Sequence, residues 1–334
     1  MANLRKYTIF IICTIIIFSV NGRQPYKPLP NSTPFMVYFS SRYRGMCSGT
    51  LVSRKAVLTA GVCCINPFSN TPDIRSINVV VGTTYRHARR GIRIQVTKIL
   101  HPTLPIEMAS RSYLLQKTVA LLLLNKAISD AFTEVPVRSI AVNFETKASD
   151  LGLKQECFTA GHHYFYKGDI IYPEFKFLLQ RNLRIQFLDV VKKEMWCEAL
   201  AIKFQKFLEN MGYGKYYEAA AGICVKDPDR IAQPCHGMFG APLICDGQMV
   251  GLLAAPDAQW TNCTGMSNIY HLLSSKFTYP FMKCIKKYFK ADIERVDLNR
   301  LKRVLHEGED EDDEDFEPEL YDSVISGSSS SDEL

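Results

Sequence analysis

The sequence predicts an all-β protein, a barrel or a sandwich, because many short strand-like runs are separated by turn residues. Residues 93–100 alternate between apolar and polar side chains and end at His101-Pro102. Residues 119–124 form a continuous apolar run, as a strand buried on both faces would. Helical periodicity appears over 192–210 and 274–289 only.

Further strands are expected in both halves of the chain. Each is a short run rich in apolar residues and bounded by glycine, proline or polar residues. The runs cover residues 35–39, 77–82, 157–163, 184–190, 241–245 and 249–254.

The first 22 residues are typical of a secretory signal peptide. Arg5 and Lys6 precede an apolar run over 7–20, and Val20-Asn21-Gly22 offers a cleavage site. The run is short for a transmembrane anchor, and no later stretch is long and apolar enough to span a bilayer. We therefore expect a secreted, extracellular protein without a transmembrane anchor, and we expect no nucleic acid partner.

Ten cysteines remain after Cys13 leaves with the signal peptide. An even number behind a signal peptide predicts a disulfide framework. The cysteines are too dispersed for a zinc site. Adjacent His162 and His163 would point to opposite faces of a strand. We expect no metal and no cofactor.

The charge is divided unevenly along the chain. Residues 307–334 hold 13 Asp and Glu and no Lys or Arg, so residues 1–306 carry +19 against +6 for the whole chain. Without Arg5 and Lys6 the body carries +17. Such a body can attract acidic glycans or acidic proteins, and the acidic tail can equally neutralise it. The tail, acidic and then serine-rich, is expected to be disordered.

The segment Cys47-Ser48-Gly49-Thr50-Leu51-Val52-Ser53, followed by Ala56 to Cys63, resembles the first-barrel signature of the trypsin/chymotrypsin family. The likeness extends over residues 34–290. It implies two six-stranded antiparallel β-barrels and a C-terminal α-helix. It leaves 23–33 as an extended lead-in and 291–306 as a basic, helical extension.

The resemblance places the three catalytic positions on residues that cannot act. The catalytic His falls on Val62, the Asp on Thr118 and the Ser on Phe239. A serine nucleophile needs a base, and the base needs an acid to orient it. We therefore expect an inactive homologue and not an enzyme.

Two further sets of residues depart from the family pattern. The Asp that receives the freed amino terminus is Met238, and no Ile-Val-Gly-Gly-like start follows residue 22. The base of the primary specificity pocket falls on Gln233, and Pro256 lies where a backbone donor would pair with substrate. The activation switch and the substrate cleft are both expected to be lost.

The resemblance also implies the pairs Cys47–Cys63, Cys157–Cys245, Cys197–Cys224 and Cys235–Cys263. It supplies no partner for Cys64 and Cys284. A fifth bridge between these two, a free thiol and an intermolecular bridge all stay open. Cys64 is also the one conceivable replacement nucleophile, although no base is evident beside it.

Several short motifs concern processing. Asn31-Ser32-Thr33 and Asn262-Cys263-Thr264 match the N-glycosylation pattern, so Asn31 and Asn262 are candidate acceptors. The terminal Ser331-Asp332-Glu333-Leu334 resembles an ER-retrieval signal. Retention in the ER lumen is therefore the alternative to secretion.

The sequence thus predicts a secreted protease homologue that binds extracellular proteins without cleaving them. Family resemblance implies a cofactor, decoy or carrier role in a protease cascade, in immunity or in reproductive secretions such as seminal fluid. An atypical hydrolase with relocated catalytic groups is the remaining alternative.

Overall fold

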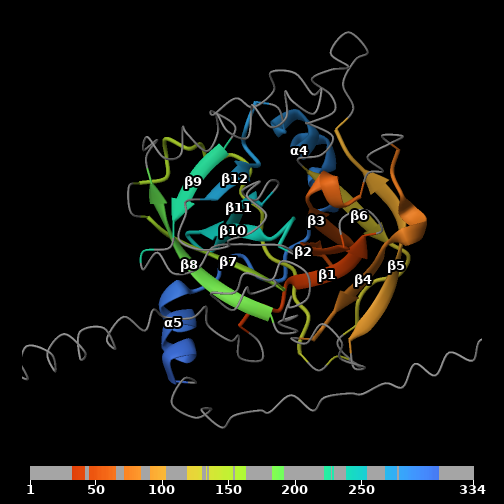
Figure 1. Cartoon of the computed structure of the whole chain (residues 1–334), viewed down its shortest axis with the longest axis horizontal. Coiled ribbons are helices and arrows are strands. Elements are labelled where there is room, and N and C mark those ends of the chain that lie inside the picture. The colour runs from red at the N-terminus through yellow and green to blue at the C-terminus, as the bar shows by residue number, and fades with distance from the viewer. Residues whose placement is uncertain are drawn as a thin grey trace, which may run out of the picture.

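The protein folds into two closed antiparallel β-barrels that lie side by side (Figure 1). This fold confirms the predicted fold class. The computed structural model describes residues 32–41, 45–64, 71–83, 91–102, 119–129, 133, 135–152, 155–162, 183–191, 222–226, 228, 238–253, 268–276 and 278–307. In the part of the chain so described, no helix is long and apolar enough to cross a bilayer.

The first barrel closes in the strand order β1-β2-β3-β6-β5-β4. Two short 3-10 helices, η1 (Gly61–Cys63) and η2 (Ile74–Ser76), follow β3. The strands are β1 (Met36–Ser41), β2 (Gly45–Ser53), β3 (Ala56–Thr59), β4 (Asn78–Val81), β5 (Ile92–Leu100) and β6 (Ala120–Leu124).

Burial explains the two sequence patterns in this barrel. In β5 the buried Ile94 and Val96 alternate with the exposed Arg93 and Gln95, as expected of a strand with one solvated face. β6 lies between β3 and β5 in the barrel. It is almost wholly buried because its residues pack in the hydrophobic cluster that both barrels share.

The second barrel closes in the order β10-β11-β12-β9-β8-β7. Four of its strands fall where the sequence predicts strands, whereas β9 and β12 carry too weak a pattern to be predicted. The strands are β7 (Glu156–His162), β8 (Leu183–Val191), β9 (Gly222–Lys226), β10 (Pro242–Cys245), β11 (Gln248–Leu252) and β12 (Asn268–Leu272).

The segment between the barrels pairs with both of them. The Ile140 N–H donates to the carbonyl of Leu51 in β2, at 2.9 Å. Three residues on, the Asn143 N–H donates to the carbonyl of Met249 in β11, also at 2.9 Å. One hydrophobic cluster runs from the first barrel through Ile140 and Phe144 into Phe158 and Ile244 of the second. The barrels therefore share a core.

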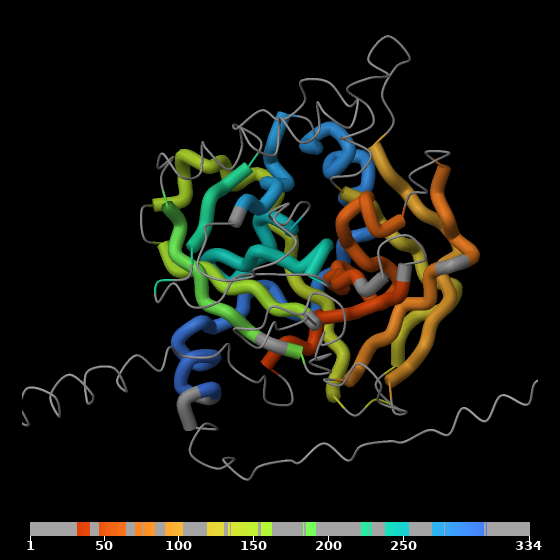
Figure 2. Tube along the Cα trace, viewed as in Figure 1, coloured from red at the N-terminus to blue at the C-terminus, as the bar shows by residue number. Residues whose placement is uncertain are grey.

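The C-terminal segment crosses the barrels again and differs from the expected long helices. Helix α4 covers Tyr279–Ile285 and continues as the 3-10 helix η6 (Lys286–Tyr288). The chain then extends, because the Lys290 N–H donates to Val52 and Ile293 forms a parallel bridge with Ile140. The blue tube in Figure 2 follows this course from α4 to α5.

Only the last part of the basic extension is helical. Helix α5 spans Leu298–Glu307, and its Leu301 and Leu305, four residues apart, are both buried. Lys302 forms an ion pair with Glu156 of β7 and lies over the ring of Phe187. These contacts hold α5 against the second barrel (Figure 1).

Asp292 holds the extended part of the C-terminal segment against Ser139 and Arg54. Its carboxylate accepts hydrogen bonds from the Ser139 N–H at 2.9 Å and the Ser139 hydroxyl at 3.0 Å, and it pairs with Arg54 at 2.9 Å. Partial burial opposes ionisation of Asp292, but these hydrogen bonds and the Arg54 charge outweigh it and lower the pKa of Asp292. Hydrogen bonding to Asp292 explains why 291–297 is not helical.

The disulfides link β2 to η1 and β7 to β10. Cys47 is bridged to Cys63, and Cys157 to Cys245, the pairs that the resemblance implies. Cys224 is also bridged. Its expected partner Cys197, and the pair Cys235 and Cys263, lie outside the described residues.

Of the three alternatives left open for Cys64 and Cys284, the structure contains free thiols and no bridge between the two residues. Cys64 is buried in the first barrel directly after η1, and its sulfur lies 3.8 Å from the Ala60 carbonyl oxygen. Cys284 is exposed on α4, where buried Met282 and Ile285 face the core instead. A buried thiol and a solvent-facing thiol cannot pair without rearranging one of these elements.

His271 predicts how stability depends on pH. Burial lowers the pKa of His271 to about 4, whereas an unfolded histidine titrates near its ordinary value of 6.5. As pH falls, His271 therefore takes up a proton in the unfolded chain before it does so in the folded protein. The contribution of neutral His271 to the free energy of unfolding is complete above about pH 6.5 and declines as pH falls toward 4. The decline should reach about 3 kcal/mol in urea unfolding titrations, and it should disappear in His271→Phe.

Candidate functional site at the seam between the barrels

The two described residues that the resemblance assigns to catalytic positions lie at the seam between the barrels. Val62 belongs to η1, directly after β3 of the first barrel. Phe239 lies in the turn that leads into β10 of the second barrel. Both side chains are half-buried and pack against the shared hydrophobic cluster. Val62 is positioned by the first barrel and Phe239 by the second. The two residues are far apart in the sequence and lie at the same seam in the fold.

Hydrogen bonds hold the two segments together at this seam. The Ser48 N–H of β2 donates to the carbonyl of Phe239 at 2.8 Å. The Thr59 hydroxyl donates to the carbonyl of the same Ser48 at 2.7 Å. The sulfur of bridged Cys63 lies 3.8 Å from the Phe239 carbonyl oxygen. The backbone of Phe239 is therefore fixed against the segment that carries Val62.

Gly240 makes this contact possible. Its φ of 83° is unfavourable for residues with a side chain, and a Cβ there would lie 2.2 Å from the Ser48 carbonyl oxygen and 2.2 Å from Thr59 Oγ1. The Gly240 N–H donates to the Leu253 carbonyl at 2.7 Å. Only glycine lets the turn approach β2 and β3 this closely.

Met238 fills the space beside this turn with an apolar side chain. It is 1% exposed, and it packs in the second barrel's cluster with Ala241 and Leu243. A Cβ on Gly161 of β7 would come within 3.0 Å of the Met238 methyl group. No room is left at this point for a charged pair.

The chemistry available at the seam is limited. Val62 and Phe239 have no atom that can take or give a proton or attack a carbonyl. The Thr59 hydroxyl is occupied by the Ser48 carbonyl. Cys64 is buried, and desolvation raises the pKa of its thiol far above the ordinary value, so it stays protonated. In the described part of the seam, these groups offer no activated nucleophile.

One serine–histidine pair does occur elsewhere in the second barrel. His271 Nε2 lies 3.2 Å from the hydroxyl of Ser275, which is itself 2.9 Å from the hydroxyl of Thr278. Each of these three residues is at most 6% exposed, and the Thr278 hydroxyl donates to the carbonyls of Leu272 and Leu273. No substrate can reach this pair, so it fixes the turn before α4.

The remaining predicted site residues lie outside the described residues. These are Thr118, Gln233, Pro256 and the candidate glycosylation sites Asn31 and Asn262. Among the described side chains, no group of three His, Cys, Asp or Glu is placed to hold a metal ion.

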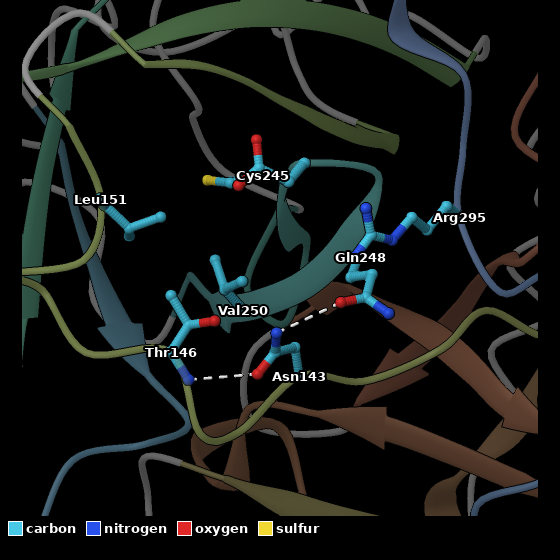
Figure 3. Close-up of a pocket in the computed structure, with 8 residues that line it drawn as sticks. Asn143, Thr146, Leu151, Cys245, Gln248, Val250 and Arg295 are labelled. Carbon is cyan, nitrogen blue, oxygen red and sulfur yellow. Dashed lines mark hydrogen bonds between the residues drawn. The ribbon is translucent and has the colours of Figure 1, made fainter.

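A separate polar hollow lies where the inter-barrel segment, the β10–β11 turn and the C-terminal segment meet (Figure 3). Its volume is about 290 Å³. The Asn143 amide donates to Gln248 at 3.2 Å and accepts from the Thr146 N–H at 3.1 Å, so much of its polar lining is already paired. No sequence pattern marks it, because its lining residues come from three distant segments. None of the seam residues lines it.

Comparisons with known proteins agree with this fold. The family model described as Trypsin matches residues 21–183, just under half of the chain. The structure of a scabies mite inactivated protease paralogue, S-D1, superposes with a TM-score of 0.53 at 14% identity, covering 81% of this chain and 100% of that one. No curated protein matches the sequence.

Two other solved structures show the same arrangement. Mouse neuropsin, a serine protease expressed in brain, has a TM-score of 0.52 at 18% identity and covers 80% of this chain and 99% of its own. Human heparin binding protein has a TM-score of 0.52 at 16% identity, with 80% and 96% covered. At these identities the likeness shows the fold alone. Together with the partial family match it defines the class of fold: the chain has the trypsin-like fold of two closed six-stranded β-barrels.

The close approach at Gly240 predicts a large effect of adding one methyl group. Gly240→Ala should lower the free energy of unfolding by at least about 2 kcal/mol, because the new Cβ meets backbone atoms that cannot move away. Gly152→Ala is the matched control, since no atom lies within 4 Å of its added Cβ. Equal stability of the two variants in denaturant titrations would contradict the described seam.

The two free thiols should differ in reactivity. Iodoacetamide should alkylate Cys284 in the native protein and Cys64 only after unfolding, because one is exposed and the other is buried with a raised pKa. Peptide mapping by mass spectrometry measures both. Rapid native alkylation of Cys64 would show that the region behind η1 is open.

Proposed function

We propose that this protein is a secreted, non-catalytic trypsin-like homologue that acts by binding other extracellular proteins, as a cofactor, decoy or carrier. The observation that carries the proposal is that Val62 and Phe239 lie at the same seam, where the residue next to Val62, Cys63, approaches the Phe239 carbonyl. Both are apolar, both pack against the shared core, and the resemblance assigns them two of the three catalytic positions.

Two catalytic groups are missing at the seam, and the packing of the residues around them also supports loss of catalysis. Triad chemistry needs a nucleophile beside a base, with an acid that orients the base. Here the Phe239 carbonyl accepts from Ser48, and the ring packs on the hydrophobic cluster. Rotation of neighbouring hydroxyls cannot replace the missing groups, because Thr59 is bound to the Ser48 carbonyl.

Met238 supports the loss of the activation switch. In active relatives, as the resemblance implies, an Asp at this position pairs with the freed amino terminus. A charge here would have to be buried among Gly161, Ala241 and Leu243, and an unpaired buried charge is strongly destabilising. Methionine at this position is compatible with a fold that is never activated by cleavage.

Secretion and partner binding complete the proposal. The signal-like segment 1–22 and the bridges Cys47–Cys63 and Cys157–Cys245 both favour an oxidising compartment. With catalysis lost, the retained property is a rigid scaffold, since two barrels with a common core present fixed loops to a partner.

Hydrolysis assays test the proposal. The purified protein at high concentration should give no turnover of generic peptide esters and no covalent labelling by a fluorophosphonate, while active trypsin gives both. Because Cys64 is the one candidate replacement nucleophile, Cys64→Ala is the matched variant. Turnover that copurifies with the protein and disappears in Cys64→Ala would overturn the proposal and favour an atypical hydrolase.

A further inference from the structure

Four lysines lie along and just beyond α4 and η6 at the C-terminal edge of the fold. Lys283, Lys286, Lys287 and Lys290 are all exposed. The first three, at spacings of three and four residues, lie near one face of the helical turn. Lys290 follows them in the extended chain beyond η6. We call these four residues the lysine row.

The lysine row has no carboxylate partner in the described part of the chain. The ion pairs Arg54–Asp292 and Lys302–Glu156 in that part use other cations. Asp292, the acidic residue closest to the row in sequence, is held by Arg54 and Ser139. The four positive charges are therefore not neutralised by these neighbours.

The helical residues that carry the lysine row are packed against the core. Met282 and Ile285 are buried beneath it. The buried ring of Phe144 lies between Tyr279, at 6.0 Å, and Phe289, at 6.2 Å between ring centroids. The ammonium groups of Lys283, Lys286 and Lys287 lie 4.8, 5.8 and 5.3 Å from the centroids of Tyr279, Phe144 and Tyr288. Cation–π contacts at these distances limit the motion of the lysine side chains.

We infer that the lysine row is a binding surface for a sulfated, linear glycan. This inference deepens the proposed function, because it names one class of partner for a protein that binds without cleaving. A row of closely spaced, unpaired ammonium groups is complementary to a chain of sulfates and carboxylates. Like charges three or four residues apart on a helix repel each other. A bound anionic chain would reduce this repulsion among the lysines.

The surroundings of the row favour a glycan over other polyanions. Binding in a membrane interface requires a face of exposed apolar side chains. On α4 only Pro280 and Cys284 among the uncharged residues are exposed, and the large apolar side chains of Phe281, Met282 and Ile285 are buried or half-buried. Single-stranded nucleic acid requires exposed aromatic faces for stacking. Here the rings of Tyr279 and Tyr288 carry lysines over them. A ligand recognised by charge alone fits these features.

A favourable interaction with the helix dipole would explain the presence of only some of the four lysines. Cations near a helix C-terminus each contribute about 0.3–1 kcal/mol, and the effect fades within the last turn. Lys286 and Lys287 stand at that end, whereas Lys290 lies beyond η6 in extended chain. The same chain carries nine Asp and Glu between residues 309 and 319. Their negative charge makes this segment a potential competitor of an external polyanion, which the test below takes into account.

The test compares two variants of equal charge in the full-length chain. The row variant carries Lys283→Gln, Lys286→Gln, Lys287→Gln and Lys290→Gln. The control variant carries Lys55→Gln, Arg93→Gln, Lys98→Gln and Lys126→Gln, four exposed cations of the first barrel. Binding of a heparin fragment of defined length is measured by calorimetry over a range of salt concentrations. Near-ultraviolet circular dichroism confirms folding of each variant.

The row variant should bind at least about tenfold more weakly, and the control should change by less than about threefold. By analogy with phosphate backbones, the slope of log Kd against log salt should approach the number of cations contacted, about four, and fall in the row variant. Equal weakening of both variants would overturn the inference in favour of net charge.

Two further experiments distinguish glycan binding from membrane binding and from competition by the acidic tail. Vesicles containing phosphatidylserine replace heparin in one arm; binding that is lost in the row variant for vesicles alone would reassign the surface to membranes. In the other arm the nine tail acids become Asn and Gln, which removes competition. Absence of heparin binding even then would overturn the inference. Neither result bears on hydrolysis, so the proposed function is tested independently.

Discussion

The structure depends most on the approach of Gly240 to the first barrel. At this point the second barrel's turn comes close to Ser48 and Thr59, and the Phe239 carbonyl accepts the Ser48 N–H. The contact is possible because glycine adopts a positive φ without strain. It fixes the relative position of the barrels at the place where the resemblance locates the catalytic positions, so the two-barrel scaffold does not depend on polar side chains there.

The C-terminal segment holds the same two barrels by different means. Lys290 bonds to Val52 of the first barrel, Ile293 pairs with the inter-barrel segment, and Val296 bonds to Gly247 of the second barrel. Asp292 is the charged anchor, since Ser139 and Arg54 both bind its carboxylate. The position of the lysine row follows from this course, because α4 is packed at one end of the segment and cannot turn its cations inward.

The apolar seam and the exposed positive charge lie in different parts of the molecule. At the seam, Met238 and Phe239 pack against the hydrophobic clusters. The lysine row is exposed, and the described carboxylates leave it unpaired. Under the proposed function the seam admits no peptide, and partners are recognised instead by charge, which acts at long range and is sensitive to salt.

The sequence by itself determined the class of fold and most strands, because the alternation in β5 and the apolar run of β6 are local patterns. The sequence predicted the two described disulfides only by resemblance to a family. It placed Val62 and Phe239 only by resemblance to a family. It did not reveal β9 and β12, the extended course of 290–296 or the free state of Cys64 and Cys284. Those were decided by tertiary structure, because strand pairing, hydrogen bonds to Asp292 and burial of a thiol depend on residues that are distant in the chain.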